Sequence, residues 1–72
     1  MGNAETEKIK ILLNHWIGHN KEHIQEFREW AEKAKRLGEA ETSDDLLEAA
    51  QDIDKANEPL LRALRRFESK KG

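Results

Sequence analysis

The sequence predicts an all-α protein in which two long amphipathic helices fold back on each other as an antiparallel hairpin. Apolar residues recur at intervals of three and four along two long segments, which is the period of a helix. Strong helix formers dominate, while valine and tyrosine are absent. The connection between the segments, residues 38–43, is short enough to force them antiparallel. We therefore expect one helical domain that spans residues 1–72.

The first helix is predicted over about residues 4–37. Asn3 can cap it, and a cluster of cations in its last turn, followed by Gly38, is a typical end signal. Gly18 lies inside this segment, and a break there, giving three helices, is the alternative. The apolar positions that define the helix are Ile9, Leu12, Leu13, Trp16, Ile17, Ile24, Phe27, Ala31, Ala34 and Leu37.

The second helix is predicted over about residues 43–69, with Thr42 or Ser43 as its cap. Pro59 removes a backbone donor inside this segment, so we expect a kink near residues 55–58. Alternatively, Asn57 caps a third helix that has Pro59 in its first turn. The heptad series continues in phase across the proline, which favours a continuous, kinked helix. Its members are Leu46, Ala50, Ile53, Asn57, Leu60, Leu64 and Phe67.

The distribution of charge supports the hairpin, and the composition argues against nucleic-acid and membrane partners. Segment 39–58 is strongly acidic, so in a hairpin it lies beside the basic end of the first helix. The net charge of −2 is not that of a nucleic-acid-binding polycation. No apolar run approaches the roughly 20 residues that span a bilayer, and no secretory leader is visible. The chain lacks cysteine, which excludes disulfides and thiolate metal sites. We expect a cytoplasmic protein with no nucleic-acid or membrane partner.

A pair of helices this long has only a thin shared core, so we expect a partner to cover the remaining apolar surface. The economical solution is a homodimer that forms a four-helix bundle, and a larger helical protein is the other possibility. Asn20 and Asn57 fall on the apolar seams, where a buried amide commonly sets register or oligomeric state. The predicted core and interface residues are Trp16, Asn20, Phe27, Trp30, Asn57, Leu60, Leu64 and Phe67.

All three histidines, His15, His19 and His23, lie four residues apart on the first helix. They lie about 120°, 80° and 40° from the centre of its apolar face, so they run from solvent to the edge of the core. Imidazoles at this spacing, with Glu26 on the same side, can bind Zn or Ni. The alternative is structural: His15 is solvated, His19 lies at the boundary, and His23 is hydrogen-bonded at the core edge.

The stretch from Leu12 to His23, followed by residues 26–31, resembles a family of short, uncharacterised prokaryotic proteins. The shared pattern is His-Trp-Ile-x-His-Asn-x-x-His, then Glu-Phe-x-x-Trp-Ala. The resemblance implies no known activity, but it does imply that His15, His19, Asn20, His23 and Trp30 form one unit.

No nucleophile or general acid–base pair emerges from the sequence, so we expect no enzymatic activity. The leading hypothesis is a small binding or accessory module that holds a transition metal. A purely structural interaction or dimerisation module is the alternative.

Overall fold

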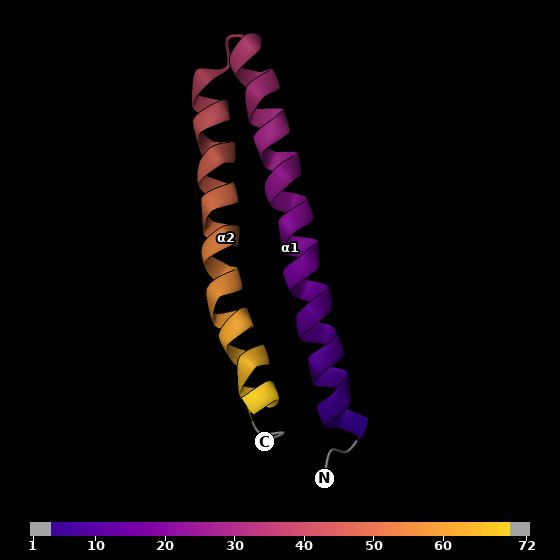
Figure 1. Ribbon diagram of the computed structural model, residues 1–72. Helices are drawn as coiled ribbons and strands as arrows, with labels where there is room; N and C mark the ends of the chain where they lie inside the picture. The colour runs from indigo at the N-terminus through magenta and orange to yellow at the C-terminus, as the bar shows by residue number, and fades with distance from the viewer. Residues whose placement is uncertain (1–3, 70–72) are drawn as a thin grey trace.

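The computed structural model describes residues 4–69, which form two helices joined by a tight turn. Helix α1 spans Ala4–Arg36 and helix α2 spans Ala40–Ser69. They run antiparallel, with the start of α1 and the end of α2 at one end of the rod and the turn at the other (Figure 1). The Cα trace measures 56 × 16 × 13 Å. The predicted all-α hairpin is confirmed.

The turn is shorter than predicted, and its geometry explains why. Gly38 adopts a φ of +84°, which a glycine reaches without strain. This lets Glu39 N–H donate to the Ala34 carbonyl at 2.8 Å and Gly38 N–H donate to the Lys35 carbonyl at 3.1 Å. These two bonds form a Schellman motif, which ends α1 and satisfies carbonyls of its last turn.

The predicted connection at 38–43 and the predicted start of the second helix at 43 are wrong. Glu39 already accepts a hydrogen bond from Ser43 N–H at 3.0 Å, so α2 begins at Ala40. Thr42 and Ser43 are therefore helical residues, and neither is the cap. Ser43 is buried where α2 first contacts α1. The predicted cap Asn3 lies outside the described residues.

Both helices are continuous through the residues that could have interrupted them. Gly18 lies inside α1 and Pro59 inside α2, so the two alternatives with a third helix are wrong. The axis of α2 curves in the half of the helix that contains Pro59 (Figure 1). A proline explains such a bend, because it cannot donate to the carbonyl four residues earlier.

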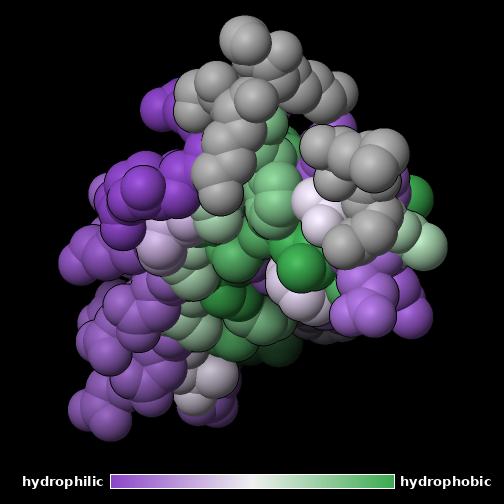
Figure 2. Space-filling view, turned by 90° about the horizontal axis from the view of Figure 1, so that it is seen from below, coloured by the Kyte–Doolittle hydropathy of each residue, from purple (hydrophilic) through white to green (hydrophobic). Residues whose placement is uncertain are grey.

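The core between the helices is narrow and built largely from small residues. Among residues 4–69, only three large apolar side chains are buried, and they all come from α1. The other buried apolar residues are alanines. Viewed along the rod from the end where the chain termini lie, apolar residues gather between hydrophilic flanks (Figure 2). A core this thin leaves other apolar side chains partly exposed. The buried apolar residues are Leu13, Ile17, Ile24, Ala31, Ala34 and Ala50.

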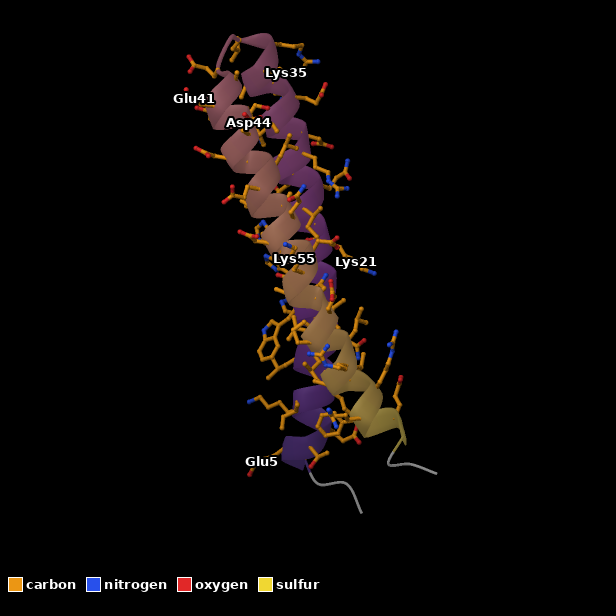
Figure 3. The ribbon with its side chains drawn as sticks, turned by 90° about the vertical axis from the view of Figure 1, so that its left-hand side faces the viewer. Glu5, Lys21, Lys35, Glu41, Asp44 and Lys55 are labelled. Carbon is orange, nitrogen blue, oxygen red and sulfur yellow. The ribbon has the colours of Figure 1, made fainter. Side chains whose placement is uncertain are left out.

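Opposite charges gather at the turn, as predicted. Lys35 near the end of α1 lies at the same end of the rod as Glu41 and Asp44 of α2 (Figure 3). Neither described helix has the length and apolar character needed to cross a membrane.

Candidate functional site

The three predicted histidines follow one another along α1, but only two of them are joined by a hydrogen bond. The rings of His19 and His23 are 4.4 Å apart, and their Nε2 atoms are 2.7 Å apart. The ring of His15 lies 5.7 Å from that of His19, edge to face. Four residues advance a helix by about 400°, so each step along the ladder turns about 40° farther from the core. The structure therefore gives a pair plus an outlying third histidine.

Glu26 completes a short hydrogen-bonded chain with this pair. Its Oε1 lies 3.1 Å from Nδ1 of His23. A carboxylate only accepts, so His23 Nδ1 carries the hydrogen of this bond. In a neutral imidazole the other nitrogen, Nε2, is then an acceptor, and it receives the Nε2 hydrogen of His19. Glu26 thereby orients His23 and leaves its Nε2 lone pair directed at His19.

The pair stands at the margin of the core. His23 is half-buried, and its ring lies 5.8 Å from that of Phe27 on the next turn. His19 and His15 are exposed. No group of three or more histidine, aspartate or glutamate side chains among residues 4–69 is arranged to hold a metal ion. One chain thus offers two neighbouring imidazole nitrogens, supported by Glu26.

A cross-helix amide pair fixes the hairpin at the same level. Asn20 Nδ2 donates to Asn57 Oδ1 at 2.9 Å, and Asn57 Nδ2 donates to the Ile17 carbonyl at 3.4 Å. Asn57 is 5% exposed and Asn20 half-buried, so this pair lies on the seam, where both residues were predicted. A one-turn slip of α2 would separate these groups and leave a buried amide without partners. The pair therefore specifies the register of the two helices.

Several predicted core residues are not buried within the hairpin. Trp16 is 45% exposed and Trp30 58% exposed, so the hairpin alone does not bury these two predicted core or interface residues. The physical reason is geometric, since a single neighbouring helix covers only one side of α1. The predicted residues that are half-buried are Phe27, Leu60, Leu64 and Phe67.

The exposed aromatics lie on one flank of α1. Ile9, Trp16, Trp30 and Leu37 share the heptad position of His23, and each of the four is 45–79% exposed. Seven residues make about two turns, so these residues form a single column beside the buried face. The spacing of seven residues between members of this column is visible in the sequence, although the column itself was not predicted.

Lys33 makes a contact with Trp30 that was not predicted from the sequence. Its Nζ lies 4.2 Å from the centroid of the Trp30 ring, over the exposed indole. This is a cation–π geometry between residues three apart on one helix. The sequence signal for this contact is a lysine that follows a tryptophan by three residues on one helix.

Most half-buried apolar residues of α2 lie on the same side of the hairpin as this column, whereas Leu61 is rotated toward the other side. At ~100° per residue, the members of the α1 group lie about 20–100° around the helix axis from Asn20. The members of the α2 group lie within the same range from Asn57, and in the same sense of rotation. In antiparallel right-handed helices, the same sense of rotation places both groups on one side of the plane that contains the two axes. We call this surface the apolar flank. Its α1 members are Ile9, Leu12, Trp16, His19, His23, Trp30 and Leu37, and its α2 members are Ala49, Ile53, Leu60 and Phe67.

The opposite side of the hairpin is largely polar. Lys21 extends outward from α1 on this side (Figure 3). Lys10, Arg28 and Glu58 are rotated in this direction, and Leu47 is the one large hydrophobic residue there that is more than 40% exposed among the described residues. The hairpin as a unit is therefore amphipathic, beyond the amphipathicity of each helix.

The fold and site define a small helical-hairpin protein with an amide-locked seam and an imidazole pair beside an apolar flank. The chain belongs to the family described as a domain of unknown function (DUF8180), whose match covers residues 9–67. The predicted membership of an uncharacterised family is confirmed. No curated protein and no solved structure matches the chain.

Proposed function

We propose that this chain is a non-enzymatic interaction module that pairs with a second copy of itself through the apolar flank to form a four-helix bundle. The observation that carries the proposal is that four of the six exposed large apolar side chains among the described residues lie on one side of the hairpin. Of the other two, Ile11 faces away from α2 and Leu47 lies on the opposite side. Trp30 is 58% exposed on this flank, and Trp16 is 45% exposed. Exposed indoles in a contiguous patch are typical of an interface.

The length and width of the hairpin as a whole are sufficient for a dimer interface. One face of the rod measures 56 Å by 16 Å, or about 900 Å². A stable interface buries about 800 Å² per partner, so a face-to-face pair of hairpins reaches this size when the rods overlap along their whole length. Stacking two such hairpins gives the square cross-section of a four-helix bundle. The centre of this bundle would then contain Trp16 and Ile53 from both copies.

Sedimentation tests the proposal with two matched substitutions. The wild-type chain of 8.4 kDa is expected to sediment as a dimer at micromolar concentration. Trp30→Glu places a charge on the flank and should raise the dimer Kd at least about tenfold, since loss of an aromatic anchor commonly exceeds about 1.4 kcal/mol. Leu47→Glu places the same charge at a 42% exposed apolar residue on the opposite side and should leave the Kd within about threefold of wild type.

Two results would contradict self-association through this flank. One is a wild-type chain that remains monomeric at about 100 μM. The other is an equal weakening of the dimer by both substitutions, which would mean that the flank has no special role. Far-ultraviolet circular dichroism of each variant checks that the hairpin is still folded.

One specific contact favours a second candidate function, the binding of a transition metal such as Zn or Ni. The Nε2 atoms of His19 and His23 are 2.7 Å apart, so one ion can reach both after a small movement of the rings. Glu26 would accept a hydrogen bond from Nδ1 of His23, the ring nitrogen that does not face the ion, as carboxylates commonly do beside metal-bound histidines. Isothermal titration with Zn²⁺ and Ni²⁺ tests this function. A chain that binds neither ion above the level of a His19→Gln/His23→Gln double variant would contradict it.

A further inference from the structure

We propose that two copies of the chain share one transition-metal ion, which is bound by His19 and His23 from each copy on the two-fold axis of the dimer. The inference rests on the proposed self-association and on the proposed metal binding, and it defines how the two are linked. A chain supplies only two imidazole nitrogens, whereas a tetrahedral ion takes four ligands. The second copy would supply the missing pair.

The spacing of residues along α1 has the symmetry that a two-fold contact needs. Leu12, His19, His23 and Trp30 are separated by seven, four and seven residues, so they are symmetric about position 21. On a helix they lie within about 40° of one another, facing away from the plane of the hairpin. A two-fold axis through position 21 exchanges His19 with His23 and Leu12 with Trp30. Leu12 of each copy thereby meets Trp30 of the other copy, which is a reciprocal contact of the kind that an isologous interface makes.

The length of the hairpin places the axis at the same position. In one way of stacking two hairpins, α1 lies over the α1 of the other copy and runs antiparallel to it. The rods overlap along their whole length only if the axis crosses the middle of α1. Since α1 spans Ala4–Arg36, its middle is near Asn20, between the turns that carry His19 and His23. The register in which the rods overlap along their whole length therefore also brings the two imidazole pairs together.

The imidazole geometry is close to what a metal requires. Two nitrogens bound to a tetrahedral Zn²⁺ at about 2.0–2.1 Å lie about 3.3 Å apart. The Nε2 atoms are 2.7 Å apart, so the rings need to separate by about 0.6 Å, and the exposed ring of His19 is free to rotate that far. On binding, His19 gives up its Nε2 hydrogen to solvent and takes one on Nδ1. The hydrogen on Nδ1 of His23 remains bonded to Glu26.

His15 provides a matched control on the same ladder. It is the third histidine of the chain and it is exposed, but it is rotated about 40° beyond His19 and points away from the proposed axis. A non-specific effect of removing any one imidazole would appear in His15→Gln as well. A shared site at His19 and His23 predicts that this variant behaves like the wild type.

The test is a titration of the full chain with Zn²⁺, Ni²⁺ and Co²⁺ in parallel with sedimentation. We expect one ion bound per two chains, with Co²⁺ giving the intense visible absorption of a tetrahedral site. His19→Gln and His23→Gln should each weaken binding at least 100-fold, and His15→Gln should change it by less than threefold. Glu26→Gln should weaken binding by about 10–100-fold, because it removes the carboxylate that orients His23.

Three outcomes would overturn the shared site. One ion bound per chain means that the copies do not share it, as expected if α1 lies over α2 of the other copy. Equal loss on His15→Gln means that the pair is not the binding site. Absence of binding by all three ions rejects the site altogether. Sedimentation of the metal-free chain separates these failures from failure of the proposed dimer, because the apolar flank would hold the dimer together without an ion.

Discussion

The most direct test of the hairpin itself is to break the amide pair between its helices. Asn57→Ala removes two hydrogen bonds, the one accepted from Asn20 at 2.9 Å and the longer one donated to the Ile17 carbonyl at 3.4 Å. Each is worth about 0.5–1.5 kcal/mol net. Asn20 is half-buried and can regain water, and the Ile17 carbonyl lies within a helix. We therefore expect Asn57→Ala to lower the free energy of unfolding by about 1.5–2.5 kcal/mol.

Substitution of the other member of the pair, Asn20, should destabilise the hairpin by a similar amount but for a different physical reason. Asn20→Ala removes one bond only, yet it leaves the Asn57 oxygen in a site that is 5% exposed, where water cannot readily replace the lost donor. An unsatisfied buried acceptor costs about 1–3 kcal/mol. The double variant removes both ends of the bond. Its free energy of unfolding should therefore fall by about 1 kcal/mol less than the sum of the decreases in the two single variants.

Urea unfolding of the four chains, at one fixed protein concentration, measures this cycle. The concentration must be fixed because association changes apparent stability. Asn14→Ala is the matched control, since Asn14 also donates to a backbone carbonyl, that of Lys10, but at an exposed position. It should change stability by no more than about 0.5 kcal/mol. A coupling energy below about 0.3 kcal/mol, or a control as damaging as Asn57→Ala, would refute the argument that this pair fixes the register.

The two described glycines should respond in opposite directions to alanine. At Gly18 an added Cβ meets nothing within 4 Å inside a helix, so Gly18→Ala should raise the free energy of unfolding by about 0.5–1 kcal/mol and the melting temperature by a few degrees. At Gly38 the space is also open, but the φ of +84° is strained for any residue with a Cβ. Gly38→Ala should therefore lower stability by about 1–2 kcal/mol. Thermal unfolding checks both, and equal shifts would contradict the explanation by backbone conformation.

Hydrophobic spacing was sufficient to predict the helices and their seam, because the three-and-four pattern continues in phase through Gly18 and Pro59. Asn20 and Asn57 could be placed on the seam for the same reason. The turn was predicted less well. Residues 41–43 are polar and include two good capping residues, Thr42 and Ser43, so local propensity favoured a later start for α2. The Schellman bonds of Gly38 and Glu39 instead allow α2 to begin immediately.

The exposure of the tryptophans could be predicted only in part. The sequence indicated that a lone hairpin cannot bury both, but not which side chains would be left outside. That choice depends on the rotation of each helix about its axis, which the buried residues determine. On α1 these residues are centred on Leu13, Ile24 and Ala31, and the seam at Asn20 lies next to them. Trp16 and Trp30 are rotated away from that centre, toward the apolar flank.

The histidine ladder shows why spacing alone could not identify the pair. Positions four apart differ by about 40° around a helix, so three histidines in series must occupy three different environments. His23 is held against Phe27 and Glu26, and His19 adjoins it with an exposed ring. His15 is turned farthest from the core. Only side-chain rotamers decide that the Nε2 atoms of His19 and His23 meet, and rotamers are not encoded in spacing. A ligand that needs two imidazoles from each copy would therefore depend on His19 and His23 and be insensitive to His15.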